Sequence, residues 1–317
     1  MQVTVLMSTY NAEKYIAETI ESILNQTYKD FELLISEDGS TDNTLNIIKQ
    51  YSEKDARIKI FAHENMGIAL SFNQAIKLIE NEWIVRMDAD DIMMPNRMER
   101  QVAFIQENPD IAVASSFVYN IDENGKIIAK YESPLTNREI VADRVKRNHA
   151  IGFHHPAVIM RKSVVQEVGG YRQEFFPTED LDLWNRIVER GYTILVQPEY
   201  LLKYRIHGTS TSISRAKTQA QKIRWIEECI VKRRNGYPEP TWQEFLDSQK
   251  RKPWWDRLNQ ERLDMGFSYY KSAVSYYSKR QLHLLFLTLI IAALLRPVYV
   301  FGQVTSKLKG VSNIADK

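Results

Sequence analysis

The residues with the clearest chemical potential are three carboxylates within four positions, Asp88-Ala89-Asp90-Asp91, which follow a strand-like run at 83–87. Carboxylate oxygens are hard ligands that suit Mg²⁺ or Mn²⁺, and either ion can bridge diphosphate oxygens. Without a cation, the crowded like charges would repel each other and raise the pKa of one carboxyl group. The motif therefore predicts a metal site at Asp88 and Asp90, although a solvated acidic loop has the same composition.

Two other polar clusters follow apolar runs near the N-terminus. Thr9-Tyr10-Asn11 comes after one such run, and Glu37-Asp38-Gly39-Ser40 comes after the next. Asp38 could accept a hydrogen bond from the imide N–H of a pyrimidine ring, which would select uracil. A turn followed by a helix cap uses Asp, Gly and Ser equally well. The second cluster alone therefore leaves both interpretations open.

A third acidic group stands at Glu179 and Asp180, where Thr178 fits the N-cap of a helix. Acidic residues in a first helical turn are stabilised by the helix dipole, which is a sufficient structural explanation. The functional interpretation makes Asp180 a general base, since a hydroxyl that attacks an anomeric carbon must lose its proton. Trp184, one turn further on, would then offer an apolar face to a sugar ring.

Two histidine positions are candidates for the same site. His207 lies in a polar segment close to Arg205, and it would complete a metal shell or bind a phosphate together with that arginine. His155, in His154-His155-Pro156, is a candidate contact for the group that receives the sugar. Neutral imidazole is a common metal ligand, but a lone histidine in a loop is more often simply solvated.

The first hundred residues alternate short apolar runs with helical patterns. Strands are predicted at 3–7, 31–35, 58–61 and 83–87, and helices after an N-cap at Asn11, around 45–51 and over 67–80. This alternation predicts right-handed βαβ units and a mostly parallel, Rossmann-like sheet with helices on both faces. Ligands bind beyond the carboxyl ends of such strands. No glycine-rich phosphate-binding motif is present, so a metal would have to hold any phosphate.

From about residue 110 the pattern becomes more β-like. Strands are predicted at 111–119, 126–130, 156–160 and 193–196, with a hairpin turn at 122–125 and a helix over 179–190. Beyond Ser214 the pattern is helical, and the charge changes at the same place. Residues 1–214 carry 23 Lys+Arg and 31 Asp+Glu, whereas residues 215–317 carry 19 and 9. An acidic body and a basic helical extension are therefore expected.

Taken together, the motifs resemble family 2 glycosyltransferases of the GT-A fold. The matching segments are 3–11 (VTVLMSTYN), 22–28 (SILNQTY), 31–42 (FELLISEDGSTD), 64–67 (ENMG), 84–91 (IVRMDADD), 95–98 (PNRM), 169–171 (GGY) and 179–184 (EDLDLW). Their order and spacing cover roughly residues 1–210. The resemblance implies inverting transfer of a sugar from a nucleotide-sugar, foremost a UDP-sugar, to a hydroxyl of a glycan acceptor.

The resemblance also implies a role for each motif. Asp88 and Asp90 would form the D-x-D pair, with Asp90 the direct ligand of Mn²⁺ or Mg²⁺, and Asp180 would be the catalytic base with Glu179 beside it. At position 37, this sequence has Glu37 where members of the family often have an aspartate. The implied nucleotide contacts are Thr9, Tyr10, Glu37, Asp38, Asp88 and Ala89. Processive members of the family combine a Q-x-x-R-W pattern with several membrane helices. Residues 221–225 (QKIRW) match the pattern, but a set of membrane helices is not predicted, which favours a hexosyl- or N-acetylhexosaminyltransferase that adds one sugar per encounter.

The expected organisation is a GT-A catalytic domain at 1–214, followed by a basic helical region at 215–317. Within the catalytic domain, 1–110 is expected to bind the nucleotide and 111–214 the acceptor. The N-terminus lacks the features of a signal peptide, and the single cysteine, Cys229, excludes an intramolecular disulfide. We therefore expect the catalytic part on the cytoplasmic side of the cell membrane. The resemblance further implies an enzyme that extends lipid-linked glycans in surface-polysaccharide synthesis.

The basic region contains an apolar run at 282–295 in which only His283 and Thr288 are polar, and Arg296-Pro297 interrupts it. As a helix it would span roughly 21 Å, short of the roughly 30 Å hydrocarbon core. Upstream, one apolar helix face is predicted at Leu263, Phe267, Tyr270, Val274 and Tyr277. Segment 282–301 is therefore expected to lie in the membrane interface as a peripheral or monotopic anchor. Burial against the body, or in a homodimer, is the alternative.

Two other functions share parts of this pattern. A sugar nucleotidylyltransferase normally has a Gly-rich, Arg-containing loop after its first strand, which residues 7–11 lack. A catalytically inactive, membrane-docked nucleotide-sugar-binding protein would be expected to lose Asp88, Asp90 or Asp180, and all three are present. Nucleic-acid binding by the basic region is disfavoured, because binding to the phosphate backbone needs charge without a long apolar run.

Overall fold

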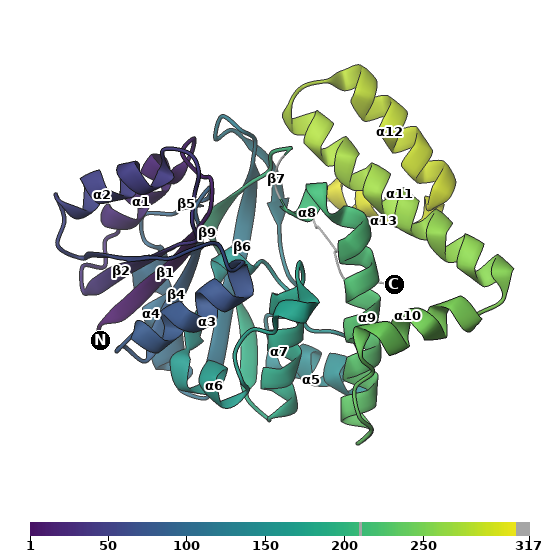
Figure 1. Cartoon of the computed structure of the whole chain (residues 1–317), viewed down its shortest axis with the longest axis horizontal. Coiled ribbons are helices and arrows are strands. Elements are labelled where there is room, and N and C mark those ends of the chain that lie inside the picture. Colours follow the sequence, from purple (N-terminus) through teal and green to yellow (C-terminus); the bar gives the residue numbers. More distant parts are fainter. Residues whose placement is uncertain (209–210, 309–317) are drawn as a thin grey trace.

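The computed structural model describes residues 1–208 and 211–308, and its N-terminal half is a parallel four-stranded sheet (Figure 1). The strands in spatial order are β3 (Ile58–Ala62), β2 (Phe31–Glu37), β1 (Val3–Thr9) and β4 (Trp83–Asp88). They are connected by α1 (Ile16–Leu24), α2 (Thr44–Ser52) and α3 (Ile68–Leu78). Right-handed crossovers place α1 and α2 on one face and α3 on the other. The predicted βαβ units are confirmed.

The second half of the sheet is mixed. Strands β8 (Ile159–Arg161), β6 (Ile111–Ile121), β9 (Thr193–Arg205) and β5 (Ile92–Met93) continue it beyond β4, and β7 (Ile127–Tyr131) forms the predicted hairpin with β6. β6 and β9 are parallel, whereas β8 runs antiparallel to both of its neighbours. The prediction of a strand from Pro156 was wrong at its start, because η1 (His155–Ala157) is a 3₁₀ turn.

Further helices cover the sheet of the body: α4 (Arg97–Glu107), α5 (Arg138–Lys146), α6 (Lys162–Glu167) and α7 (Glu179–Glu189), with the 3₁₀ turn η2 (Gln173–Phe175) before α7. Most of the apolar residues of the sheet and its helices form one continuous buried cluster. α7 contributes Leu183, Trp184 and Ile187 to this cluster, which fixes the helix on the sheet and its N-terminus at the site described below.

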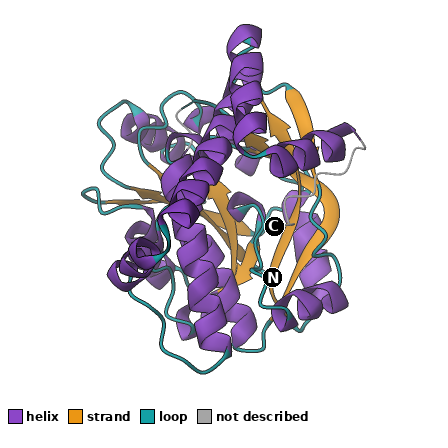
Figure 2. Cartoon of the chain, turned by 90° about the vertical axis from the view of Figure 1, so that its right-hand side faces the viewer, coloured by secondary structure: helices purple, strands orange, loops and turns teal. Residues whose placement is uncertain are grey.

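The C-terminal region is helical, as predicted, and its last nine residues, 309–317, lie outside the described residues. Its elements are α8 (Thr211–Ser214), α9 (Ala216–Arg234), α10 (Trp242–Arg251), α11 (Trp254–Ser278), α12 (Leu282–Leu295) and α13 (Pro297–Leu308). α11 and α12 pack side by side at one end of the molecule (Figure 1). Figure 2 views the molecule from the side that carries these helices.

Helix α9 joins this region to helix α7. Arg233 on α9 forms an ion pair of 2.5 Å with Glu189 and lies 3.6 Å from Asp182, both of which belong to α7. Asp182 also pairs with Arg172. A separate apolar cluster built around Phe175 and Trp225 lies under the same contact. The body and α9 therefore share a packed and ion-paired boundary.

Helix α12 has the bounds predicted from its apolar run, and only Thr288 and Ala292 of its residues are buried. In the described part of the chain, no helix combines the length and the apolarity needed to cross a bilayer. Most of the apolar surface of α12 faces outward, since Phe286, Ile290 and Leu294 are all more than half exposed.

One predicted helix cap was wrong. Asn11 has φ of +50°, and α1 begins at Ile16 rather than directly after Asn11. Asparagine tolerates this left-handed conformation better than most residues. Its side-chain oxygen instead accepts a hydrogen bond from the backbone N–H of Thr41 at 2.8 Å. Asn11 thus ties the loop after β1 to the loop after β2, next to the cleft described below.

Candidate active site

A cleft of about 1900 Å³ opens at the carboxyl ends of the parallel strands. The strand register explains why the predicted motifs meet there: Thr9 pairs with Glu37, and Ser8 pairs with Asp88, so β1, β2 and β4 end at the same level. Most of the predicted site residues line this cleft: Thr9, Tyr10, Asp38, Asp88, Ala89, Asp90, His155, Glu179, Asp180 and His207. Glu37 and Trp184 do not line it.

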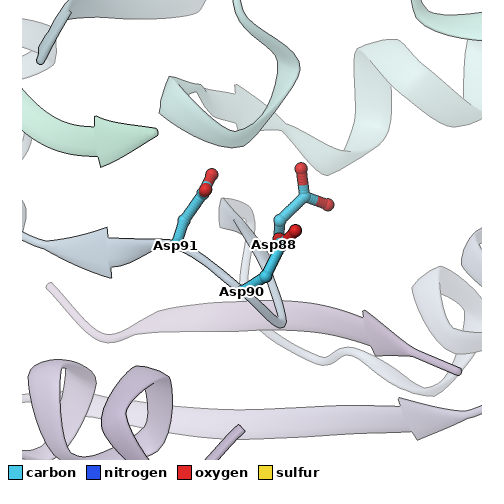
Figure 3. Close-up of side chains that lie close together, drawn as sticks. All are labelled: Asp88, Asp90 and Asp91. Carbon is cyan, nitrogen blue, oxygen red and sulfur yellow. The ribbon is translucent and has the colours of Figure 1, made fainter. Parts of the chain in front are cut away.

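The acidic cluster lies at the turn between β4 and β5. Carboxylate oxygens of Asp88, Asp90 and Asp91 all lie within 4.8 Å of one another, and Figure 3 shows the three side chains gathered at this turn. β4 ends at Asp88, and residues 89–90 form a turn. The tight turn itself brings the carboxylates together. Asp91 was not predicted as part of the site.

Each carboxylate of the cluster has a different partner. Asp88 forms an ion pair of 2.5 Å with Arg86, and Asp90 lies 2.7 Å from Nε2 of His207. Asp91 accepts a hydrogen bond of 2.8 Å from the backbone N–H of Arg205 through one oxygen. Its other oxygen is buried and has no hydrogen-bond partner among the described residues. That oxygen is therefore a polar atom whose burial is uncompensated.

The electrostatics of the cluster favour a cation. Burial raises the pKa of Asp91 well above its usual value, and the negative charges of Asp90 and Asp88 raise it further. Burial also raises the pKa of Asp88, although the neighbouring Arg86 works against this. A divalent ion would neutralise the crowded charges and satisfy the orphaned oxygen. The hard oxygen donors, with His207 beside them, fit Mg²⁺ or Mn²⁺.

A second pair of carboxyl groups lies across the cleft, at the start of α7. Burial and the charge of Asp180 raise the pKa of Glu179 to about 8. Burial raises the pKa of Asp180 to about 6, against the opposing effect of the Leu181 backbone N–H and the charge of Arg86. Near neutral pH, Asp180 is therefore ionised while Glu179 keeps its proton. Two neighbouring carboxyls with pKa values pushed apart are a common arrangement of acid–base sites.

Arg86 is a site residue that sequence reasoning missed. Its guanidinium is buried beneath the cleft on β4, and its charge acts on Asp88, Glu179 and Asp180 together. Burial alone lowers the pKa of Arg86, but Asp88 outweighs this and the net shift is upward. An arginine within an otherwise apolar strand was the available signal, because charged residues are almost never fully buried unless paired.

Asp38 is mainly occupied by contacts within the protein. Its two carboxylate oxygens accept hydrogen bonds from the backbone N–H groups of Met66, at 2.7 Å, and Gly67, at 3.1 Å. Gly67 has φ of +85°, a conformation that favours glycine. Glu37 lies further back and accepts a hydrogen bond from the Ser40 backbone N–H. Both acidic residues thus shape the loops at the end of the cleft formed by β1 and β2.

Of the two predicted acceptor contacts, His155 lines the cleft and Trp184 does not. Trp184 is 0% exposed and stacks on Phe153 in the core, so it has no face to offer a sugar. This prediction was wrong because an aromatic residue one turn into an amphipathic helix points equally well to the core. His155 lines the cleft, but its Nε2 shares a hydrogen bond of 2.7 Å with the Tyr171 hydroxyl. Burial lowers the pKa of His155 well below its usual value, which keeps it neutral.

Comparison with known proteins identifies the family of the chain. The family model for glycosyl transferase family 2 matches residues 4–169. The O-antigen biosynthesis glycosyltransferase WbnJ of Escherichia coli is 34% identical over 219 residues, which cover 67% of this chain and 82% of WbnJ. The chain therefore belongs to glycosyl transferase family 2, and it is a glycosyltransferase.

Solved structures support the fold. TarS of S. aureus (residues 1–349, in complex with UDP) matches with a TM-score of 0.54 at 19% identity, over 96% of this chain and 92% of TarS. A mannosyltransferase from Pyrobaculum calidifontis, in complex with GDP-Man and Mn²⁺, matches with a TM-score of 0.56 at 16% identity, over 96% and 80% of the two chains. The protein thus has the predicted GT-A fold, a mostly parallel sheet with helices on both faces and a helical C-terminal extension.

Proposed function

We propose that the protein transfers one hexose or N-acetylhexosamine from a UDP-sugar to a hydroxyl of a lipid-linked glycan, with inversion at the anomeric carbon. The observation that carries this proposal is the meeting of two acidic groups in one cleft, Asp88-Asp90-Asp91 on one side and Glu179-Asp180 on the other. Transfer from a nucleoside diphosphate needs both a counter-charge for the diphosphate and a base for the acceptor.

The donor is proposed to bind at the end of the cleft formed by β1, β2 and β4. Tyr10 is half exposed at this end and would cover the base. Asp38 would recognise uracil with carboxylate lone pairs that are not used in its hydrogen bonds to the loop. The UDP bound to TarS supports this choice of nucleotide. Ala89 and Asp88, directly after β4, would contact the sugar-diphosphate.

Asp90, Asp88 and Asp91 would hold Mn²⁺ or Mg²⁺, with His207 fixing Asp90 from behind. The bound ion supplies positive charge to the diphosphate, which stabilises it as a leaving group. The Mn²⁺ reported with the Pyrobaculum calidifontis enzyme supports this assignment. Buried Arg86, paired with Asp88, keeps the cluster from carrying its full negative charge before the ion binds.

Asp180 is proposed as the base, because it is the member of the α7 pair that is ionised near neutral pH. It would take the proton of the acceptor hydroxyl while that oxygen bonds to the anomeric carbon. The bond from this carbon to the diphosphate oxygen breaks at the same time, and the nucleoside diphosphate leaves. Glu179 would remain protonated and hold the polar end of the acceptor. Attack from the side opposite the leaving group gives inversion.

The proposed organisation assigns donor binding to residues 1–110, acceptor binding to residues 111–214 and membrane attachment to residues 215–317. On α12, the exposed residues Leu282, Phe286, Ile290 and Leu294 are spaced by four and form a continuous apolar stripe. Lys279 and Arg280 are exposed at the turn before it. An apolar stripe next to basic residues suits the interface of an anionic membrane, here the cytoplasmic face of the cell membrane.

Membrane attachment is tested by flotation with vesicles that contain or lack anionic lipid. The intact protein should float with anionic vesicles, and the double variant Phe286→Asp, Ile290→Asp should stay in the soluble fraction. The double variant Phe286→Ser, Leu78→Ser, in which Leu78 lies on α3, introduces no charge and serves as a partial control. It should lose less flotation than the double aspartate variant. Absence of flotation by the unaltered protein would rule out the anchor and favour a homodimer through α12.

The catalytic proposal is tested by nucleotide release from UDP-, GDP- and dTDP-sugars in the presence of Mn²⁺, Mg²⁺ or EDTA. Release is expected from a UDP-sugar, is expected to depend on the divalent ion, and should rise when a glycan acceptor is added. Turnover that survives EDTA would contradict the role of the acidic cluster. No turnover and no binding of any donor would contradict the proposal as a whole.

A further inference from the structure

Four of the five residues of the apolar helix face predicted from the sequence, Leu263, Phe267, Tyr270 and Val274, line the active-site cleft, whereas Tyr277 does not and is half exposed. The residues of α11 that line the cleft are Gln260, Leu263, Asp264, Phe267, Tyr270, Lys271 and Val274. Their spacing of three and four places them on one face of the helix. The same cleft contains Asp88, Asp90 and Asp180, so α11 forms a wall of the cavity in which the reaction takes place.

This wall is only partly explained by packing. Tyr270 belongs to a small buried cluster with Ala292 and Val300, but Leu263 and Phe267 belong to none of the apolar clusters found among the described residues. Both are partly buried and line the cleft. Apolar and aromatic side chains that border a cavity instead of a core commonly contact a ligand.

Aromatic rings face the cavity from both sides. On the helical side, the Tyr299 ring of α13 lies 5.9 Å from the Phe267 ring and 5.3 Å from the Tyr270 ring. On the side of the sheet, His154 lies 4.3 Å from Tyr131 and 4.9 Å from Tyr204. All six residues line the cleft. Aromatic faces edged by polar groups suit sugar rings, which have apolar C–H faces and hydroxyl rims.

The wall is fixed by contacts with neighbouring helices. Arg224 on α9 makes a two-point ion pair with Asp264 on α11, at 2.5 and 2.9 Å. A Cβ at Gly266 of α11 would lie 2.8 Å from the Cβ of Arg296, so this glycine permits close packing of the end of α12. The wall is therefore preformed, which lowers the entropic cost of binding a flexible chain.

Size and continuity identify the occupant. A cleft of about 1900 Å³ exceeds the 300–1,000 Å³ typical of a pocket for one small molecule. The donor is proposed to fill the end near β1 and β2, and the attacking hydroxyl must lie at Asp180. The part of the acceptor behind that hydroxyl must then continue into the remaining arm of the cleft, between the sheet and α11.

We propose that α11 and α13 form a binding wall for the acceptor glycan, with Phe267 and Tyr299 stacking on sugars behind the one that is extended. This inference rests on the proposed glycosyl transfer and adds the class of acceptor: a chain of two or more sugars rather than a single sugar or a bare lipid carrier. The wall lies away from the reacting atoms, so it should lower the KM for the acceptor and leave kcat nearly unchanged.

The test uses fluorescently labelled mono-, di- and tetrasaccharides of hexoses and N-acetylhexosamines, with the donor that the nucleotide-release screen selects. For the unaltered enzyme, kcat/KM should rise at least about tenfold from mono- to tetrasaccharide, which corresponds to about 1.4 kcal/mol. Phe267→Ala and Tyr299→Ala should remove most of this gain by raising the KM for the tetrasaccharide. The KM for the donor should not change.

Met265→Ala is the matched control, because Met265 is exposed on the same helix, α11, and does not line the cleft. It should keep the full preference for longer acceptors. Should Phe267→Ala fold poorly, judged by its melting temperature and its donor KM, Leu263→Ser tests the same wall at a residue outside the apolar clusters.

Three outcomes would overturn the inference. They are an unaltered enzyme that ignores acceptor length, a Phe267→Ala variant that keeps the preference, and a lipid-linked monosaccharide that outperforms the tetrasaccharide. Failure to release nucleotide from any donor is a different result, because it would overturn the proposed glycosyl transfer itself. Normal nucleotide release without a preference for length would overturn only the wall.

Discussion

The two acidic groups of the cleft are built differently, although both combine partly buried and fully buried carboxyl groups. Asp88, Asp90 and Asp91 are drawn together by a turn, and cationic or N–H groups from β4, β9 and His207 approach each of them. Glu179 and Asp180 stand at the first turn of α7, where backbone N–H groups are the nearest compensation.

The difference indicates how position assigns chemistry to one residue type. Three crowded carboxylates with an orphaned oxygen create a demand for a cation. Asp180, with a pKa of about 6, can instead accept a proton near neutral pH, whereas Glu179, with a pKa of about 8, keeps its own. Each of the following changes should affect one group and spare the other.

The largest expected effect is that of Asp90→Ala. Removing the proposed direct metal ligand should reduce transfer at saturating donor by at least about 10³-fold, since metal ions contribute several kcal/mol to such reactions. The stabilisation of the protein by Mn²⁺ in thermal unfolding should disappear as well. Asp143→Ala is a control, because Asp143 is exposed and pairs only with Arg147 on α5. Metal-dependent transfer by Asp90→Ala would contradict the assignment.

Asp180→Asn should lower kcat by about 10²- to 10⁴-fold, the usual contribution of a general base. The carboxamide keeps the shape of the side chain, so the donor Kd and the response to Mn²⁺ should remain those of the unaltered enzyme. Isothermal calorimetry and nucleotide release measure the two effects separately, with Asp143→Asn as the matched control. If Asp180→Asn keeps most of its turnover, another group is the base.

The pH profile should show the base directly. Because a base must be ionised to accept a proton, and the pKa of Asp180 is about 6, kcat/KM should fall about tenfold per pH unit below that value. Rates are measured at saturating Mn²⁺ so that loss of metal does not mimic protonation. A profile that stays flat down to pH 5 would contradict the assignment of Asp180 as the base. A profile that first rises near pH 8 would instead give that role to Glu179.

A smaller effect is expected on stability. The raised pKa values of Asp88 and Asp91 mean that the folded state holds protons that the unfolded state releases. The metal-free protein should therefore lose stability as pH rises above the ordinary carboxyl range. Mn²⁺ should oppose this loss, by about 2.7 kcal/mol at a hundredfold excess over Kd. A gain in melting temperature on adding Mn²⁺ that does not grow between pH 6 and 8 would count against this view.

Much of the site could be predicted from the sequence, because apolar runs fix the strands and the parallel register then brings their ends together. Thr9, Asp38 and Asp88 needed only this local information. Arg86 and Asp91 were missed, since their importance depends on burial and on neighbours from β9 and α7. The two-residue strand β5 is too short for any periodicity.

The C-terminal helices show the same limit more strongly. Helicity and the bounds of α12 follow from composition alone. The direction in which α11 turns its apolar face does not, because a cavity wall and a membrane-facing surface have the same pattern of residues. Trp184 shows the opposite error, because its residue type suggested contact with a sugar ring whereas the side chain lies in the core.

The ion pairs between α7 and α9 limit where the chain can be truncated or recombined with a relative. A fragment ending at residue 214 would lose Arg233 and Arg234, the two partners that pair with Glu189 from α9, on the helix that carries Asp180. Exchanging C-terminal regions between relatives should therefore succeed only when the crossover point follows α9, so that α7 keeps the ion-pair partners that α9 provides.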